Sequence, residues 1–421
     1  MLLIKNGRVI DPASQTDAAL DVLLDGERIA QVGKQIHAPQ AEILNAEGLV
    51  VAPGFIDLHC HLREPGEETS ETIATGVRAA ARGGFTAVCP MPNTKPVNDN
   101  AAVTRGILER AQAAGGVRVW PIGAASAGSK GEALAEIAAM KQAGIVAVSD
   151  DGRPIATARL LRQVMDYCRA LDLPVIDHCE DASLAAGGVM REGRQSVRLG
   201  LHGMPAATES IAVARDIQVA ELTGGRLHIA HLSTRASLEL VRAAKQRGLP
   251  VTCEVTPHHF TLADDDVAYD ARFKMNPPLG SREDREALAA GLADGTVDAI
   301  ATDHAPHEPA SKDVEFDRAP FGVIGFETAL ALALDELVRA RDLKLMRLVE
   351  LFSTGPARVL GLTRRIVPGE PAELTLFSTD HPWTFRAEES ASRSRNTPFD
   401  ARSFRGAPMA TIISGRIVFR R

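Results

Sequence analysis

Eight short apolar runs alternate with longer helix-like stretches through the middle of the chain, and this alternation constrains the fold more than any other feature. The runs are GFIDLHCHL, GFTAVCPM, VRVWPIGAA, GIVAVSDD, LPVIDHCE, RLHIAHLS, PVTCEVTPHH and VDAIATDHA. Several intervening stretches, such as ETIATGVRAAARG, end in glycine, which commonly terminates a helix. Strands alternating with helices indicate an α/β fold, and eight repeats predict a closed (β/α)8 TIM barrel. A doubly wound open sheet is the alternative, although no glycine-rich nucleotide loop follows the first strand.

The two ends of the chain have a different pattern. Residues 1–50 contain short strand-like runs with turn signals at Asn6-Gly7 and Asp25-Gly26, which are typical of hairpins. The runs AELTLFS and ATIISGRIVFR repeat this pattern near the C-terminus. We therefore expect a small β-sandwich domain formed from both chain ends. Its predicted parts are residues 1–51 and 363–421, and the predicted barrel covers 52–362.

Composition and charge are those of an ordinary globular protein. The chain has 421 residues, of which 45% are hydrophobic and 24% are charged. The net charge of -7 and the lack of a long basic run disfavour a nucleic-acid partner. No run reaches the roughly 18 uncharged apolar residues that a membrane span needs. Lys5 and Arg8 interrupt the N-terminus, so no signal peptide and no membrane association are expected.

The five cysteines indicate reduced thiols. Their number is odd, none forms a CxxC pair, and four lie in apolar strand-like runs. Disulfide bonds persist mainly in oxidising compartments, whereas an isolated thiol behaves as a small apolar side chain. We therefore predict mostly buried, unpaired thiols and a cytoplasmic location.

Almost every strand-like run ends in a side chain that can bind a metal or carry a negative charge. These residues are His59, His61, Asp151, His178, His231, His258, His259, Asp303 and His304. In barrel enzymes the carboxyl ends of the strands carry the active site. Imidazole and carboxylate groups at the ends of buried strands are costly unless they are paired or ligated. The pattern therefore predicts a polar site at this end of the barrel.

The first run contains His59 and His61 two positions apart. Side chains at i and i+2 of a strand point to the same face, so both rings face the barrel axis while Cys60 faces the helices. Neutral imidazole is a good zinc ligand. An isolated HxH is more often a surface pair, but this one follows an apolar strand and lies between Asp57 and Arg63. We interpret the histidines as metal ligands.

The later strand ends supply the other candidate ligands. Asp151 could form a turn before Gly152, or its carboxylate could bridge two cations. His178 and His231 would each, alone, more often be satisfied buried histidines, but two at equivalent strand ends favour ligation. Asp303 could bind metal and also exchange protons with a bound water. Four histidines and two aspartates suffice for a two-metal site with ions about 3.5–4 Å apart. The chain contains no GxSxG motif, so covalent catalysis by a serine is the weaker interpretation.

In combination these motifs resemble the dihydroorotases of the amidohydrolase superfamily. The stretches that carry the resemblance are PGFIDLHCHLREPG (53–66), MPNTKP (91–96), SDDG (149–152), DHCED (177–181), AHLST (230–234), VTPHH (255–259), KMNPPL (274–279), ATDHAPH (301–307), APFGVIGFET (319–328) and NTPF (396–399). The resemblance covers essentially the whole chain. It implies a barrel with a flanking β-sandwich and the reversible interconversion of N-carbamoyl-L-aspartate and L-dihydroorotate in pyrimidine synthesis.

The resemblance also implies individual roles. One zinc ion would be held by His59, His61 and Asp303, a second by His178 and His231, and Asp151 would bridge both. Asp303 would be the catalytic proton carrier. Arg63 and Asn93 would bind the substrate carboxylate. The rest of the substrate pocket would consist of His61, Asn276, His307 and the backbone at Phe321 and Gly322.

Related activities and partners remain as alternatives. Dihydropyrimidinases, hydantoinases and allantoinases generally bridge their metals with a carbamylated lysine, whereas the fourth run here ends in Asp150 and Asp151. Arg63 also suits an acidic substrate better than a neutral ring. A non-catalytic scaffold of aspartate transcarbamoylase is a second alternative, disfavoured by the complete ligand set. An active enzyme could still bind that partner or form a homodimer. The ligands would also accept manganese, cobalt or iron.

Three further features stay open at this stage. Residues 304–321 are polar and rich in turn formers, so they could be a mobile lid or an ordinary solvated loop. His258 and His259 are interpreted as neighbours of the ligands or pocket residues without a metal role. Lys274 could carry a surface charge or a pocket charge. Departures from the family pattern at Glu373 and Asp400 lie far from the predicted site.

Overall fold

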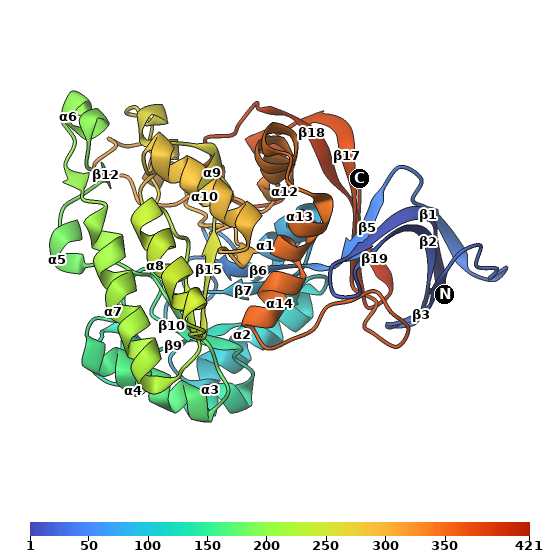
Figure 1. Cartoon of the computed structure of the whole chain (residues 1–421), viewed down its shortest axis with the longest axis horizontal. Coiled ribbons are helices and arrows are strands. Elements are labelled where there is room, and N and C mark those ends of the chain that lie inside the picture. The colour runs from blue at the N-terminus through green and yellow to red at the C-terminus, as the bar shows by residue number, and fades with distance from the viewer.

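The computed structural model describes residues 1–421 and shows a barrel joined to a smaller β domain (Figure 1). The barrel strands in order are β6 (Phe55–Cys60), β7 (Phe85–Pro90), β8 (Arg118–Val119) with β9 (Ile122–Ala124), β10 (Ala147–Ser149), β11 (Val175–Asp177), β14 (Leu227–Ile229), β15 (Val251–Val255) and β16 (Ala299–Ile300). Each strand pairs in parallel with the next. β8 pairs with β7 and β9 pairs with β10, so together they form the third strand.

The chain just after β16 closes the barrel against β6. Asp303 N donates to His59 O (2.9 Å), and His61 N donates to His304 O (2.8 Å). The closed parallel barrel predicted from the alternation is confirmed. Closure places the first and last strand ends side by side, although 244 positions separate residues 59 and 303 in the sequence.

Helices cover the outside of the barrel (Figure 1). They are α1 (Ile73–Arg82), α2 (Ala101–Ala114), α3 (Ile137–Ala143), α4 (Ala158–Ala170), α7 (Ala207–Thr223), α8 (Arg235–Gln246), α10 (Arg282–Asp294), α13 (Leu345–Phe352) and α14 (Thr354–Val359). Polar side chains define several N-termini, because each accepts a hydrogen bond from a free N–H of the first turn. These capping residues are Thr72, Asn100, Thr157, Thr234 and Ser281.

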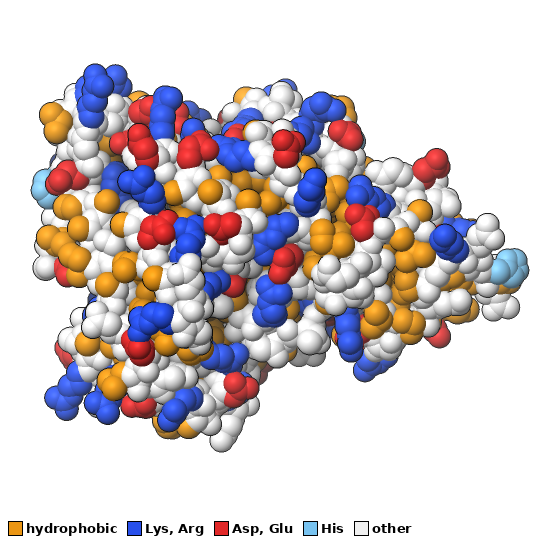
Figure 2. Space-filling model, in the orientation of Figure 1, with side chains coloured by type: hydrophobic (Ala, Val, Ile, Leu, Met, Phe, Trp, Pro, Cys, Tyr) orange, Lys and Arg blue, Asp and Glu red, His pale blue; other side chains and the backbone are white.

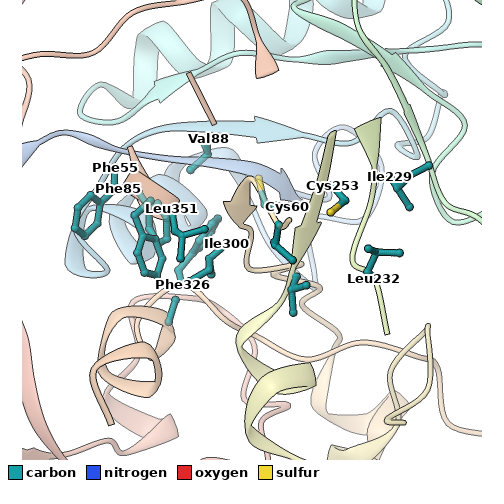
Figure 3. Packing of buried hydrophobic residues seen from close by; sticks show 14 of the residues in the cluster. Phe55, Cys60, Phe85, Val88, Ile229, Leu232, Cys253, Ile300, Phe326 and Leu351 are labelled. Carbon is teal, nitrogen blue, oxygen red and sulfur yellow. The ribbon is translucent and has the colours of Figure 1, made fainter. Parts of the chain in front are cut away.

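Two apolar layers hold the barrel together. The larger layer lies between strands and helices and contains 72 buried residues, among them Phe55, Phe85 and Phe326 (Figure 3). Cys60 belongs to this layer, as expected for a residue between two inward-facing histidines. The smaller layer includes small inward-facing side chains such as Ala87. All five cysteines are buried and free, as predicted.

Short elements extend the loops that follow the barrel strands. They are η1 (Ala127–Ser129), α5 (Ala182–Ala185), β12 (Met190–Arg191), α6 (Arg194–Leu199), β13 (Gly203–Met204), α9 (Pro257–Thr261), η2 (Asp264–Asp266), η3 (Ala271–Phe273), α11 (Pro309–Lys312), α12 (Ala329–Ala333) and η4 (Leu334–Arg339), and η5 (Ala387–Glu389) lies near the C-terminus. None of the helices combines the length and apolar composition that a membrane crossing requires. Figure 2 shows acidic and basic side chains interspersed on the face in view.

The β domain is one mixed sheet made from both chain ends. Its strands are β1 (Leu2–Asp11), β2 (Thr16–Asp25), β3 (Arg28–Gly33), β4 (Glu42–Asn45), β5 (Val50–Pro53), β17 (Leu374–Thr384), β18 (Ser403–Ile413) and β19 (Arg416–Arg420). Antiparallel pairing of β17 with β5 joins the two ends. The β18–β19 turn reaches the β2–β3 turn, because a Cβ on Gly415 would lie 1.9 Å from Gly26 O. The sheet thus curls around its own core of 15 buried residues.

One predicted turn is wrong in detail. Asp25-Gly26 does connect β2 and β3, but Asn6-Gly7 lies inside the continuous strand β1, where the register shifts. Asn6 N donates to Asp21 Oδ1 (3.0 Å), which satisfies the backbone at this bulge. A Cβ on Gly7 would lie 2.5 Å from Val51 Cγ2, so glycine serves close strand packing here rather than a hairpin.

Candidate active site

The six side chains predicted as metal ligands meet at the carboxyl end of the barrel. All are buried, and each lies in β6 or within three residues after the end of β6, β10, β11, β14 or β16: His59, His61, Asp151, His178, His231 and Asp303. The ligand atoms of five of them form two triads that share Asp151, and Asp303 lies beside the two histidines of the first triad. The shared carboxylate is the position at which the sequence predicted a bridge.

The first half of the cluster joins β6 to the last strand end. His59 Nε2 lies 3.2 Å from Asp151 Oδ1 and 3.6 Å from Asp303 Oδ1. His61 Nε2 lies 3.1 Å from Asp303 Oδ1 and 3.6 Å from Asp151 Oδ2. Two imidazole nitrogens and two carboxylates therefore surround one point.

The second half has two histidines and the shared carboxylate. His178 Nδ1 lies 3.0 Å from His231 Nε2. Both nitrogens are 3.7 Å from Asp151 Oδ1. A second carboxylate, that of Glu180, lies 3.6 Å from His178 Nε2, the ring nitrogen that does not face His231.

The geometry fits divalent metal ions. Ligand atoms roughly 2.0–2.1 Å from a tetrahedral zinc ion lie about 3.3 Å from one another, and the separations in both halves, 3.0–3.7 Å, bracket that value. His59 Nε2 and Asp151 Oδ1 are buried without any hydrogen-bond partner. Buried polar atoms are rarely left in this state, and a bound cation would satisfy both. The nitrogen and oxygen donors suit zinc and other first-row metals.

Hydrogen bonds behind the cluster set which ring nitrogen faces it. His59 Nδ1 donates to Glu254 Oε1 (3.1 Å), and His61 Nδ1 donates to Asn93 Oδ1 (3.0 Å). Because these oxygens only accept, the Nε2 atoms keep their lone pairs for the cluster. His231 also presents Nε2, but its Nδ1 is buried without a partner.

Charge favours ionised carboxylates in this cluster. Burial alone would raise the pKa of Asp151, but His59, His178 and His231 face it and lower its pKa well below the usual range. Burial also raises the pKa of Asp303 and the neighbouring histidines lower it, and the net effect is again a lowered pKa. Both side chains are therefore anionic near neutral pH.

A cavity of about 350 Å³ opens above the cluster. All the predicted site residues except His59 line it, and His59 lies beneath its floor. The lining residues are His61, Arg63, Asn93, Asp151, Gly152, His178, His231, Asn276, Asp303, Ala305, His307, Pro320, Phe321 and Gly322. The structure thus brings the predicted ligand and substrate positions into one pocket.

Several polar groups face this pocket with hydrogen-bonding capacity to spare. Arg63 is the only lysine or arginine in the lining. Its Nε donates to Pro306 O (3.1 Å), and Glu67 Oε2 lies 3.9 Å from one of its terminal nitrogens. Asn276 Nδ2 donates to Glu180 Oε2 (2.9 Å), whereas Asn276 Oδ1 is buried without a partner. Asn93 Nδ2 lies beside Gly152, where a Cβ would approach to 3.1 Å.

The wall opposite the cluster is built from backbone. Burial lowers the pKa of His307 to about 3, so the ring is neutral and Nε2 donates to Phe321 O (2.7 Å). Gly322 N donates to Lys274 O (2.9 Å). Gly322 has φ +133°, and a Cβ there would lie 2.7 Å from the Ala305 Cβ. Only glycine fits this position.

The segment 304–321 packs against the pocket through two buried lysines. Lys312 Nζ donates to Ala271 O (2.9 Å), Lys274 O (3.1 Å) and Pro320 O (2.7 Å). The Lys274 ammonium lies 4.6 Å from the centroid of the Phe321 ring. Lys274 therefore supports the pocket wall from within and is not a surface charge. Movement of this segment as a lid stays a prediction.

Sequence reasoning missed three polar residues near the cluster: Glu254 and Glu180 contact predicted ligands, and His228 contacts Glu254. Glu254 and His228 lie inside strands β15 and β14, where the apolar pattern hid them, and Glu180 follows His178. A charged residue in a fully buried run such as VTCEV was the signal that could have identified Glu254. His259 bonds Thr256 and Pro277 instead of joining the cluster, in line with its expected lack of a metal role.

Known proteins place this arrangement in a family. A family model described as dihydro-orotase-like matches residues 48–237. The dihydroorotase of Solibacter usitatus is 56% identical over 422 aligned positions, covering 100% of this chain and 98% of the relative. The dihydroorotase of Desulforapulum autotrophicum is 50% identical, covering 100% and 99% of the two chains.

Among solved structures, the L-hydantoinase (dihydropyrimidinase) of Arthrobacter aurescens has the same fold, with a TM-score of 0.88 and 23% identity over 100% of this chain and 96% of that one. This likeness concerns the fold: a barrel with a β domain formed by the chain ends. The full-length identity to dihydroorotases is more than twice as high. This chain belongs to the dihydroorotase family.

Proposed function

We propose that the protein is a cyclic amide hydrolase with dihydroorotase activity, interconverting N-carbamoyl-L-aspartate and L-dihydroorotate in pyrimidine biosynthesis. The observation that carries the proposal is the pair of ligand triads sharing Asp151 beneath a pocket in which Arg63 is the only lysine or arginine of the lining. The curated relatives support the same activity. A cytoplasmic location, suggested by the five free thiols, is part of the proposal.

Two zinc ions are the proposed cofactors. One would be held by His59, His61 and Asp303, the other by His178 and His231, with Asp151 shared. When bound, such ions acidify a water molecule and polarise an amide carbonyl. The remaining steps are assigned to the side chains of this chain.

The polar groups of the pocket that can form further hydrogen bonds would orient the substrate. Arg63 and the Asn93 amide would bind the substrate carboxylate, because a guanidinium fork meets a carboxylate with two parallel hydrogen bonds. The unpartnered Asn276 Oδ1 can accept a hydrogen bond from a ring N–H. His307 and the backbone at Phe321 and Gly322 would form the wall against which the ring packs.

Asp303 is the proposed proton carrier. In hydrolysis it takes a proton from the attacking water and returns it to the ring nitrogen that leaves as the amide bond breaks. In the synthetic direction the same carboxyl group returns a proton to the departing water as the ring closes. General acid–base assistance of this kind contributes roughly 10²–10⁴-fold to the rate.

Hydrolysis of a neutral cyclic amide such as hydantoin is the main alternative. The hydantoinase structures share the fold, but Asp151 stands at the bridging position and Arg63 faces the pocket. Arg63 favours an acidic substrate, and Asp151 differs from the carbamylated lysine that is expected of a hydantoinase. A scaffold role for aspartate transcarbamoylase would not require six converging ligands. Association with that enzyme and homodimer formation remain predictions.

Turnover of N-carbamoyl-L-aspartate, measured on protein of known zinc content, tests the proposal. We expect activity that is lost on treatment with a chelator and restored by zinc. Hydantoin and dihydrouracil serve as matched neutral substrates and should react far more slowly. Folded, zinc-loaded protein that turned over hydantoin but neither carbamoyl aspartate nor dihydroorotate would overturn the assignment.

A further inference from the structure

A buried carboxylate lies directly beneath the candidate metal centre. Glu254, on β15, is completely inaccessible to solvent. Its Oε1 accepts a hydrogen bond from His59 Nδ1 (3.1 Å), and its Oε2 accepts one from His228 Nε2 (3.1 Å). One carboxylate thus connects a predicted metal ligand on β6 with a histidine on β14, across the interior of the barrel.

The chain of contacts continues to the backbone. His228 Nδ1 lies 2.8 Å from Thr252 Oγ1, and the two residues are paired in register on β14 and β15. The Thr252 hydroxyl also lies 3.3 Å from Leu227 O. His228 is therefore fixed at both ring nitrogens, and Glu254 is held in place by a rigid neighbour.

The fold alone gives no reason for this carboxylate. The barrel interior contains a cluster of apolar side chains that includes Ile56, Ile176 and Ala230. No lysine or arginine pairs with Glu254, and a buried carboxylate without such a partner is expensive compared with an apolar side chain of similar size. Its two acceptor oxygens instead meet two histidine rings.

The consequence for His59 is chemical. A carboxylate accepts hydrogen bonds and donates none, so it keeps the proton of His59 on Nδ1. Nε2 then carries the lone pair, and this atom is the buried, unpartnered one that lies 3.2 Å from Asp151 Oδ1. Carboxylates behind metal-bound histidines fix the ring orientation and increase the basicity of the ligating nitrogen.

We propose that Glu254, held by His228, is the positioning residue for His59: it fixes the tautomer and the direction in which His59 presents Nε2 to the ion. It contacts neither the pocket nor the reacting atoms, so its effect passes through His59. The inference rests on the proposed metal centre. His231 provides a contrast within the same cluster, because its Nδ1 has no partner.

Zinc affinity, measured by competition with a chromophoric chelator, tests this role without an activity assay. Glu254→Ala should lower the affinity of the first half of the cluster by about 10–100-fold. Glu254→Gln should fall between wild type and Glu254→Ala, because an amide has one oxygen acceptor where the carboxylate has two. Glu373→Gln is the matched control and should leave zinc affinity unchanged. Glu373 is also buried, but it pairs with Arg118 and Arg364 away from the cluster.

A second measurement separates positioning from a purely structural role. The melting temperature of each variant is recorded with and without zinc, since a ligand that binds only the folded state raises it. A positioning role predicts that Glu254→Ala reduces the zinc-induced rise, and that Glu254→Gln, which preserves shape, reduces it less. An unchanged rise and wild-type zinc affinity in both variants would overturn the inference. Wild-type protein that bound no zinc would overturn the metal centre itself.

Discussion

Two buried carboxylates near the carboxyl end of the barrel differ in how completely the protein satisfies them. Glu209, on α7, accepts hydrogen bonds from Ser233 N (2.9 Å), Thr234 N (3.1 Å) and both hydroxyl groups of these residues. Asp151 has an oxygen without any hydrogen-bond partner, although three histidines surround it. The oxygens of Glu209 accept hydrogen bonds that join a helix to a loop. Asp151 has an oxygen that is free to bind a ligand from outside the chain.

This difference distinguishes structural from functional polar groups more reliably than burial does, because both carboxylates are under 5% exposed. Folding removes each of them from water at similar cost. What separates them is the number of protein donors that compensate for the loss. The same criterion applies to Asn276 and His59, whose orphaned atoms face the pocket and the cluster.

The largest effect is expected for Asp303→Asn, which changes a carboxylate of the proposed catalytic site. An amide cannot accept and return the proton, so kcat/KM should fall by at least about 10²–10⁴-fold. Denaturant unfolding should change far less, because the only side-chain hydrogen bond of Asp303 is with His61 inside the cluster. A variant that kept its rate within tenfold of wild type would show that Asp303 is not the proton carrier.

A large loss of stability is expected for Glu209→Gln, which changes the carboxylate whose hydrogen bonds are all made within the protein. The amide group would turn N–H donors toward the donors of Ser233 or Thr234, and the free energy of unfolding should fall by about 2–4 kcal/mol. Its zinc-induced rise in melting temperature should persist. Asp151→Asn is the matched comparison and should lose that rise. Equal behaviour of the two variants in these melts would contradict the distinction.

A moderate effect is expected for Arg63→Lys, which changes a pocket residue that is proposed to bind the substrate. Lysine keeps the charge but loses the two-pronged geometry, so KM for carbamoyl aspartate should rise about 10-fold or more while kcat changes less. Steady-state kinetics on the variant provide the test. Hydantoin, which has no carboxylate, is the control substrate. A change confined to kcat would indicate that Arg63 does not bind the substrate carboxylate.

The smallest effect is expected for an exposed carboxylate. The hydrogen bond from Arg341 lowers the pKa of Glu286, which is half-exposed. The ion pair should therefore stabilise the fold above the usual glutamate pKa, by less than about 1 kcal/mol, and lose this contribution as the pH falls through the lowered value. The urea midpoints of wild type and Glu286→Gln should differ slightly near neutral pH and converge in acid. If the difference between the two urea midpoints grew in acid, the ion pair would not stabilise the fold in the way proposed.

The ligand set could be predicted from sequence because strand periodicity and strand ends locate it. His59 and His61 share a face by their spacing, and Asp151, His178 and Asp303 follow buried runs, so a closed barrel brings them together. The structure confirms the fold, and it places these residues as the pattern indicated. Their roles toward metal and substrate remain predictions until they are measured.

Other features depend on contacts that no local pattern contains. Glu254 meets His59 and His228 only after β6, β14 and β15 are arranged around one axis. Lys312 joins segments 271–274 and 320 through three carbonyl groups, which a polar stretch does not reveal. The bulge at Asn6 depends on the side chain of Asp21 in the next strand.

The closure of the barrel has a consequence for the order of assembly. Asp57 accepts hydrogen bonds from both the backbone and the hydroxyl group of Thr302, so it fastens the last strand to the first. Until that seam forms, His59 and His61 are separated from Asp303 by a loop of more than two hundred residues, whose closure is entropically unfavourable. A growing chain on the ribosome therefore lacks the complete first half of the metal cluster until most of the polypeptide has emerged. In the proposed two-metal site, the half that contains His59, His61 and Asp303 would therefore be completed only when the ring of strands closes.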